Sequence, residues 1–326
     1  NGASLRQIDG LEKIVTFGDR ALMNCADLQI VTLGNELETV GFGTFEGCTS
    51  IRALTLPFVG NTRKENTYLG YVFGAVQPDF AKGFYPNDLA KITLTNSCQT
   101  LGNYAFFECE SLKEIDLPEG LESIGVRAFY GCTSLWKLEL PNSVSTIREA
   151  AFFGCDALTN ITIPEGVTSI GYDAFYNCSS LTSIVIPDSV TSIGSSAFSH
   201  CSSLVSVTIP DSVKFIGNYA FRNCYALTSV VIPDSVTSIG DNAFYDCSRL
   251  KNVYYRGSEE DRRAITIEMG IQNSGLGLIL LFNDRIFDPT IWDNNGGMVF
   301  ITAIWGVWHI ISGLITSSIF RRSKLM

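Results

Sequence analysis

Histidine is almost missing from this chain: only His200 and His309 occur among its 326 residues. No two cysteines are separated by two residues, and no Asp-x-Asp-x-Asp-Gly loop occurs. Zinc sites are built mainly from closely spaced histidine and cysteine ligands, and calcium needs six or more oxygen ligands. We therefore expect no metal site and no cofactor.

Charged residues and catalytic motifs are also scarce. Charged residues make up 17% of the chain, and the net charge is −10 without a basic stripe. Binding of DNA or RNA depends on clustered lysine and arginine, so neither is expected as a partner. The motifs G-x-x-x-x-G-K-[ST], G-x-S-x-G and H-E-x-x-H are absent, and each marks a common class of enzyme. We expect no catalytic residues and no enzymatic activity.

What the chain contains instead is a repeat with a period of 23 residues. A constant period between about 20 and 50 residues is typical of a solenoid, in which each unit contacts only its neighbours. Such a stack offers a binding surface but few places where unlike residues converge into a catalytic site. Phenylalanine and proline keep the same interval as cysteine, which recurs at Cys109, Cys132, Cys155, Cys178, Cys201, Cys224 and Cys247.

One unit, residues 158–180, indicates the path of the chain. Alternating apolar residues at its start predict a short strand with one buried face. Pro164 ends this strand because it has no amide hydrogen, and a second extended stretch runs to a bend at Gly171. Each unit should form one coil of a superhelix with a parallel sheet on its concave side. The last apolar residues are spaced for the inner face of a helical turn: Ala174, Phe175 and Cys178.

The repeat sets the expected organisation of the chain. Ten units fill residues 1–250, so no separate N-terminal domain is expected. The leading apolar residue of the unit returns every 23 residues, except that Ile51 and Leu89 are 38 residues apart. The sequence therefore predicts an insertion at about residues 58–88.

The ten cysteines are expected to be free. Nine share one repeat position, and the tenth, Cys98, takes a position that valine fills in later units. Both positions favour a small apolar side chain, and free cysteine is among the most buried residue types. Equivalent cysteines of neighbouring coils would lie about 5 Å apart, but their parallel directions do not suit a disulfide. We expect ten buried, reduced thiols.

These residues resemble a known family. The unit L-x-x-I-x-I-P-x-x-V-x-x-I-G-x-x-A-F-x-x-C is similar to the BspA-like leucine-rich repeat of surface proteins from host-associated bacteria and some protists. Residues 251–283, which begin Lys251-Asn-Val-Tyr-Tyr, resemble the terminal cap that often follows these repeats. The resemblance implies a right-handed leucine-rich-repeat solenoid of β-α coils exposed outside the cell, with adhesion or ligand capture as its function.

The outward positions of the first strands are the first candidates for partner binding. They are charged in the fourth to sixth units and small and neutral in the later ones. Trp136 lies beside the charged positions, and its large ring suits an anchor for a partner. Alternatively, these positions are simply solvated and vary between duplicated units. The charged candidates are Lys91, Glu114, Asp116, Lys137 and Glu139.

The insertion is the second candidate. It places aromatic residues among glycines, and the residues proposed for contact are Tyr68, Tyr71 and Phe73. Long loops on a rigid scaffold often carry recognition. Alternatively, these aromatics cover the exposed end of the interrupted coil.

The C-terminal composition predicts a membrane anchor. Residues 298–320 carry no formal charge, and about 20 apolar residues span a bilayer as a helix. Arginine and lysine follow within the cytoplasmic tail predicted at residues 321–326, as expected for a segment that enters from outside. Residues 284–297 would form a linker. Alternatively, the apolar segment docks on the solenoid.

Together these patterns predict a non-enzymatic recognition scaffold that is secreted or exposed at the cell surface. Its partner would be an extracellular protein or glycan of a host or neighbouring cell. The alternative is a structural spacer or stalk with no specific ligand. Asn1 opens the chain without a leader, which indicates that a secretion signal was removed or that the fragment starts after one.

Overall fold

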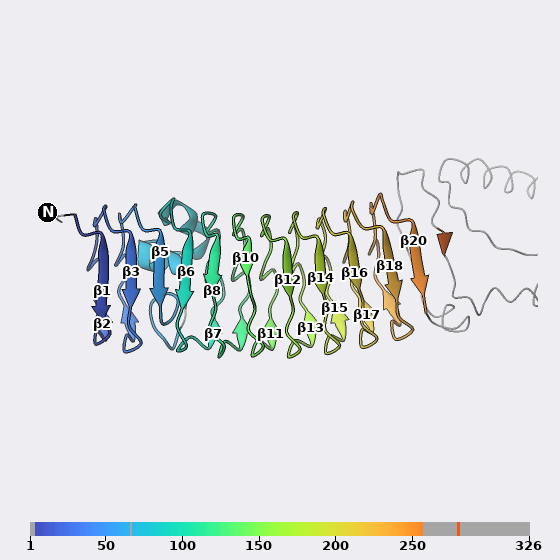
Figure 1. Ribbon diagram of the computed structural model, residues 1–326, viewed down its shortest axis with the longest axis horizontal. Helices are drawn as coiled ribbons and strands as arrows, with labels where there is room; N and C mark the ends of the chain where they lie inside the picture. The colour runs from blue at the N-terminus through green and yellow to red at the C-terminus, as the bar shows by residue number, and fades with distance from the viewer. Residues whose placement is uncertain (1–3, 66, 257–278, 281–326) are drawn as a thin grey trace, which may run out of the picture.

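The computed structural model of the protein describes residues 4–65, 67–256 and 279–280. The chain winds into a row of coils, and each coil repeats the path of the one before it (Figure 1). We number the coils by their leading apolar residue, from coil one at Leu5 to coil eleven at Leu250. The predicted repeat solenoid is confirmed.

Every coil contributes a first strand to the same side of the stack. Neighbouring strands pair in parallel with a register of one repeat, so that Ser183 lies beside Ser206 and Ile184 beside Val207. Equivalent side chains therefore form rows, with the apolar rows inside and the polar rows outside. The first strands are β1 (Gln7–Leu11), β3 (Ile30–Leu33), β5 (Ala53–Leu56), β6 (Lys91–Leu94), β8 (Glu114–Asp116), β10 (Lys137–Leu138), β12 (Asn160–Thr162), β14 (Ser183–Val185), β16 (Ser206–Thr208), β18 (Ser229–Ile232) and β20 (Asn252–Tyr255), and β21 (Ile279–Leu280) pairs with β20.

A second, two-residue strand follows in most coils and confirms the expected second extended stretch. It places one apolar side chain in the core and one side chain toward the surface. Coil three has no second strand among its described residues, because the insertion interrupts it there. The second strands are β2 (Thr16–Phe17), β4 (Thr39–Val40), β7 (Thr100–Leu101), β9 (Ser123–Ile124), β11 (Thr146–Ile147), β13 (Ser169–Ile170), β15 (Ser192–Ile193), β17 (Phe215–Ile216) and β19 (Ser238–Ile239).

The third side of each coil differs from the expected helical turn. It is a run of hydrogen-bonded turns in which the amides bond alternately within the coil and to the next coil. Phe175 N donates to Ala197 O of the following coil at 2.8 Å. Tyr176 N donates to Asp173 O of its own coil at 3.0 Å. A helix needs all of these amides for its own carbonyls, so bonding between coils replaces helix formation. We call this side of the stack the turn side.

The core is built around a column of stacked rings. One phenylalanine per coil stacks on the next from Phe106 to Phe244, with ring centres 5.1 to 5.4 Å apart and planes within 23° of parallel. These rings are fully buried. Because each ring covers a face of its neighbours, the column makes the packing of one coil depend on the next.

The cysteines form a second column beside the phenylalanines. From Cys132 to Cys247, each thiol donates to the carbonyl oxygen of the phenylalanine in the preceding coil, at 3.0 to 3.3 Å. All ten thiols are free and nine are buried. Cys25 is half-buried because its coil ends the described stack, which corrects the expectation of ten buried thiols. Burial raises the pKa of Cys109 and Cys201 to about 12.

Neighbouring coils lie in close contact at the glycine that follows the second strand. A Cβ atom on Gly194 would lie 2.7 Å from the carbonyl carbon of Gly171 in the preceding coil. Glycine is needed here because a side chain would collide with backbone. Gly154 on the turn side has a different role: its φ is +67°, and a Cβ atom there would meet nothing closer than 3.8 Å. That glycine serves a left-handed backbone rather than a close approach.

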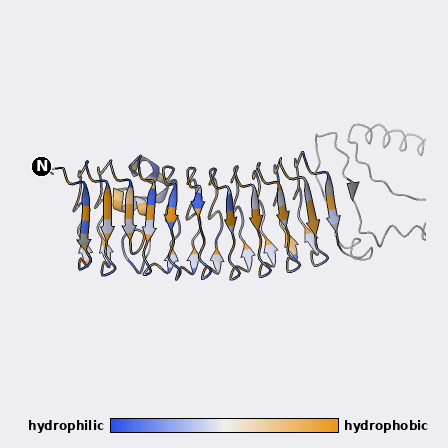
Figure 2. Ribbon diagram, viewed as in Figure 1, coloured by the Kyte–Doolittle hydropathy of each residue, from blue (hydrophilic) through white to orange (hydrophobic). Residues whose placement is uncertain are grey.

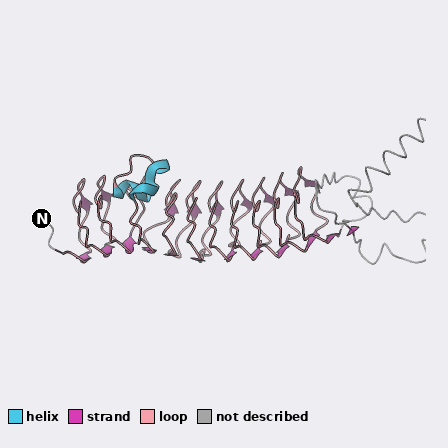
Figure 3. Cartoon of the chain, turned by 90° about the horizontal axis from the view of Figure 1, so that it is seen from above, coloured by secondary structure: helices cyan, strands magenta, loops and turns pink. Residues whose placement is uncertain are grey.

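The insertion in coil three contains the two helices found within the described residues. Both are short 3-10 helices, η1 (Leu69–Phe73) and η2 (Pro78–Phe84). They lie on the side of the stack away from the first strands, as Figure 3 shows from above. The insertion is therefore a projection from the turn side of the solenoid.

Most of the predicted C-terminal segments lie outside the described residues. Of the predicted cap at residues 251–283, the structure describes β20 and β21, which continue the sheet of first strands. The predicted linker (284–297), transmembrane helix (298–320) and tail (321–326) all lie outside the described part. Across residues 4–65, 67–256 and 279–280, no helix has the length and apolar character needed to cross a membrane.

The thiol column leads to a labelling prediction. A thiol reagent should modify Cys25 at most in the native protein, because the other thiols are buried. After denaturation without reductant, all ten cysteines should react, as counted by mass spectrometry. Fewer reactive thiols, together with disulfide-linked peptides, would contradict the column of free thiols.

The two kinds of glycine should differ in their response to alanine. Gly194→Ala should lower the free energy of unfolding by about 2–3 kcal/mol, because its Cβ forces two coils apart. Gly154→Ala should cost about 1 kcal/mol, because only the left-handed backbone is penalised. Urea denaturation measures both. Equal losses of unfolding free energy in the two variants would show that the close approach of the coils at Gly194 does not make substitution more costly there.

Candidate functional site

The first strands of coils four to six bring the predicted charged residues together. Lys91 on β6 lies beside Glu114 on β8, and Glu114 lies beside Lys137 on β10. The sign of the charge therefore alternates across three neighbouring strands. Figure 2 shows hydrophilic residues on these strands, in contrast to the more hydrophobic first strands of later coils. We call the set Lys91, Glu114, Asp116, Lys137 and Glu139 the charged patch.

Lys91 organises the carboxylates of the patch. Its Nζ lies 3.0 Å from Asp116 Oδ2 and 4.0 Å from Glu114 Oε2, and Thr93 Oγ1 donates to Asp116 Oδ2 at 3.1 Å. The hydrogen bond from Lys91 lowers the pKa of Asp116, and Thr93 and Lys137 act in the same direction. Exposed ion pairs add little to stability. Their effect here is to hold charges of known sign in fixed positions on the sheet.

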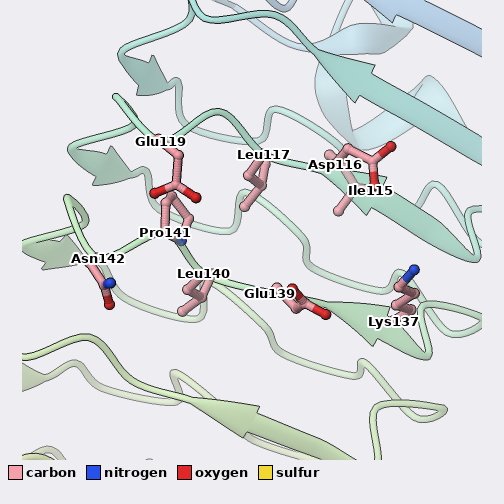
Figure 4. Close-up of a pocket in the computed structure, with 9 residues that line it drawn as sticks. All are labelled: Ile115, Asp116, Leu117, Glu119, Lys137, Glu139, Leu140, Pro141 and Asn142. Carbon is pink, nitrogen blue, oxygen red and sulfur yellow. The ribbon is translucent and has the colours of Figure 1, made fainter.

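A depression of about 240 Å³ lies between coils five and six at the edge of the patch. Figure 4 shows Asp116 and Lys137 on the two neighbouring strands at one end, with Glu119 and Asn142 at the other. Glu119 and Glu139 form no ion pair within the described residues. The depression is open and mostly polar, so it suits a protruding side chain of a partner. The apolar part of its lining is Ile115, Leu117, Leu140 and Pro141.

The carboxylates of the patch do not converge as metal ligands. Glu114 and Asp116 are two residues apart on one strand, which separates their Cβ atoms by about 7 Å, and both carboxylates lie within reach of Lys91 Nζ. A hard divalent cation needs several oxygens around one point. In the part of the chain that the structure describes, no group of three histidine, cysteine or carboxylate side chains could hold a metal ion.

Trp136 stands beside the patch, as the sequence indicates. It precedes β10, and its amide donates to Lys113 O of the preceding coil at 3.2 Å. The backbone at this position is therefore held by the stack, while 51% of the residue surface remains exposed. A partner that covered the ring would bury apolar area without reordering the backbone.

Phe73 of the insertion is part of the core and is 2% exposed. Phe45 N donates to Val72 O at 2.8 Å, which reproduces the bond that each regular phenylalanine makes to the alanine of the next coil. Val72 and Phe73 thus replace the Ala-Phe pair of the repeat. The Phe73 ring centre lies 6.1 Å from those of both Phe45 and Tyr85. The structure therefore removes Phe73 from the surface.

Tyr68 and Tyr71 are half-buried and pack edge to face, with ring centres 6.4 Å apart. The Tyr68 hydroxyl donates to Ala75 O at 2.9 Å, so its polar group is already bonded. These contacts support the covering role that the sequence left open. The exposed aromatics of the insertion are instead Phe80, at 64%, and Phe84.

The candidate residues therefore lie in two separate places. The charged patch and Trp136 belong to the first strands, whereas Tyr68, Tyr71 and Phe73 belong to the projection on the turn side (Figure 3). The two groups are close in sequence, but the coil carries them to different sides of the stack. A partner bound on the sheet would not contact the insertion aromatics at the same point.

Sequence reasoning missed a second aromatic column on the turn side. Each member of this column directly follows the core phenylalanine of its coil, and the four members are Phe107, Tyr130, Phe153 and Tyr176. Their rings stack with centres 4.9, 4.4 and 4.6 Å apart. Arg127 lies over the column, with Cζ 5.7 Å from the Tyr130 ring centre. The signal in the sequence that could have revealed this column was a pair of adjacent aromatic residues that recurs every 23 residues. Because the rings cover one another, mainly their edges reach the surface.

His200 ends this second column. Its ring centre lies 5.0 Å from that of Tyr176 at a tilt of 44°, and the Asn223 amide nitrogen lies 3.1 Å from its Nε2. Partial burial lowers the pKa of His200, and the nearby Arg222 acts in the same direction. The imidazole is therefore neutral at physiological pH and serves as a packing group.

The chain is similar to solved structures of other leucine-rich repeat proteins. A Treponema pallidum leucine-rich repeat protein shares 31% identity, over 57% of this chain and 86% of its own, with a TM-score of 0.47. A leucine-rich cell surface protein of Faecalibacterium prausnitzii shares 23% identity, over 81% of this chain and 87% of its own, with a TM-score of 0.42. A pneumococcal vaccine antigen shares 20% identity, over 78% of this chain and 58% of its own, with a TM-score of 0.40. No curated protein matches the sequence.

The repeat itself matches a family description directly. Six copies of the BspA type leucine rich repeat region are found, over residues 1–70, 81–202 and 168–261. These ranges cover nearly all of the coils described above. The chain belongs to the BspA-type leucine-rich repeat family.

Proposed function

We propose that this chain is a recognition scaffold at the cell surface that binds an extracellular protein through the charged patch and Trp136. The observation that carries the proposal is the difference in charge between the first strands of coils four to six and those of the later coils. Coils four to six hold alternating charges in fixed positions beside an exposed tryptophan, whereas the later coils present serine, threonine and valine. A leucine-rich repeat of this family is suited to a protein-binding role.

The two parts of the surface would contribute differently. Fixed charges of both signs favour one orientation of a partner and increase its rate of association. Most of the affinity would come from burial of Trp136, because aromatic anchors at the centre of an interface dominate binding energy. The unpaired Glu119 and Glu139 at the depression favour a basic side chain of the partner at that position.

We also propose that residues 298–320 anchor the chain in a membrane. The proposal rests on the uncharged sequence of this segment and the basic residues that follow it. The coils would then lie outside the cell, where the patch can meet an extracellular partner.

Binding should depend on Trp136 and not on the later strands. We expect Trp136→Ala to weaken binding by at least about 1 kcal/mol, or roughly fivefold in Kd. The measurement uses the whole chain in detergent against immobilised extracellular-matrix proteins and mucin. Ser206→Ala combined with Thr208→Ala is the matched control on a later strand and should change Kd less than about twofold.

Three outcomes of this binding experiment contradict the proposal. One is the absence of saturable binding to any probe, which favours a spacer without a ligand. Another is a larger loss in the Ser206 and Thr208 control than in Trp136→Ala. A third is binding to mucin that disappears after removal of its glycans, which would identify a glycan rather than a protein as the partner.

The anchor can be tested by fractionation. The full-length chain should remain with membranes during alkaline carbonate extraction, because an inserted helix is not released by loss of charge contacts. A chain that ends at Asn294 should be released. A full-length chain that is monomeric in buffer without detergent would instead support docking of the segment on the solenoid.

A further inference from the structure

The stack contains a junction at which the strands do not pair. One six-stranded sheet ends at β10, and the next begins at β12. The second strands are interrupted at the same place, between β11 and β13. Within the described residues, no other junction between coils lacks pairing of its first strands. We call the junction between coil six (135–157) and coil seven (158–180) the seam.

Hydrogen bonds are lost on both strand sides of the seam. In coil seven, the amides of Thr159, Thr168 and Gly171 donate to no carbonyl of coil six within the described structure. The equivalent amides of coil eight do donate to the coil before them. The missing bonds of coil seven are therefore not a general property of these repeat positions. Those regular bonds are Thr182 N to Thr159 O at 2.9 Å, Thr191 N to Thr168 O at 2.9 Å and Gly194 N to Ile170 O at 2.8 Å.

The turn side remains connected across the seam. Phe152 N donates to Ala174 O at 2.8 Å, and the Cys178 thiol donates to Phe152 O at 3.2 Å. The rings of Phe152 and Phe175 stack at 5.1 Å, as elsewhere in the column. Coils six and seven are thus joined along one side and unpaired along the other two. This is the geometry of a hinge.

The backbones at the corner after the second strand are packed less closely at the seam than elsewhere. Arg148 stands where the neighbouring coils have the glycine that follows the second strand. A Cβ atom at this position in coil nine, on Gly217, would lie 2.4 Å from the backbone of the preceding coil. The Cβ atom of Arg148 therefore faces coil five, and the Arg148 amide still donates to Ile124 O of that coil at 3.1 Å. The coil that follows stands farther off: a Cβ atom on Gly171 would have 3.2 Å of clearance.

The seam also divides two kinds of surface. The charged patch, Trp136 and the insertion all precede it. The outward positions of the first strands in coils seven to ten carry no charge and are nearly copies of one another. Those positions are Asn160, Thr162, Ser183, Val185, Ser206, Thr208, Ser229 and Val231.

We infer that the solenoid consists of two blocks that open independently at the seam. Residues 4–157 form a binding block, a name that rests on the proposed function, and residues 158–256 form a spacer block whose number of coils can change. Gly171 marks the boundary, because a Cβ atom there would clear coil six by 3.2 Å, whereas one on Gly194 would lie 2.7 Å from coil seven. The shared ring column keeps the blocks attached while the strand sides of the seam open.

Amide hydrogen exchange of the full-length chain tests the seam without any ligand. Thr159, Thr168 and Gly171 should exchange at least about tenfold faster than Thr182, Thr191 and Gly194, which occupy the same positions one coil later. Equal exchange of the two sets would overturn the inference.

Removal of one coil tests the independence of the blocks. Deletion of residues 181–203 takes out one complete repeat of the spacer block and leaves the register intact. Exchange of the amides in β6, β8 and β10 should then change by less than about twofold. A larger change would show that the two blocks are coupled. This result is separate from the binding experiment, since a chain without a ligand can still have a seam, and a chain without a seam can still bind.

Discussion

The hydrogen bonds between successive backbone coils are the interaction on which this molecule depends. Its strands are two to five residues long, too short to persist as isolated pairs. The coils are stable because their amides donate to neighbouring coils on the turn side and, except at the seam, on the strand sides. This bonding requires that equivalent backbone atoms lie a few ångströms apart. The glycine after the second strand and the stacked phenylalanines meet that requirement, and each serves a contact with the neighbouring coil.

The same requirement decides where the surface can vary. Inward positions are restricted to apolar side chains that fit between copies of themselves, so differences between units appear on outward positions and in the insertion. Lys91, Glu114 and Lys137 can alternate in sign because they occupy one outward row of the sheet. The insertion avoids breaking the core by supplying its own replacement for the Ala-Phe pair. The outward surface thus varies from coil to coil without a change in the interior.

The seam shows the opposite case, in which the stacking itself is interrupted. The sheets on two sides of the stack end between coils six and seven, where the backbones at the corner are farther apart than at Gly194. The core continues past the seam, because ring stacking on the turn side does not depend on that corner. Because the core continues where the sheets are interrupted, the molecule can bend at the seam. The seam separates the coils that carry the charged patch from the later coils, whose outward residues are nearly identical.

Periodicity in the sequence was sufficient to predict the solenoid, the positions of the strands, the core column and the rows of outward residues, because each unit packs against copies of itself. It also located the charged patch and Trp136. Three features required the tertiary structure. The expected helical turn is a series of turns bonded to the next coil, since its amides have better partners there than within the unit. Phe73 is buried, and the insertion lies away from the patch, because the path of the coil and not distance in sequence sets which residues meet. The seam follows from how closely two backbones approach, a quantity that no single unit reveals. Sequence determined what each coil buries, and the stacking of one coil on another decided what remains at the surface.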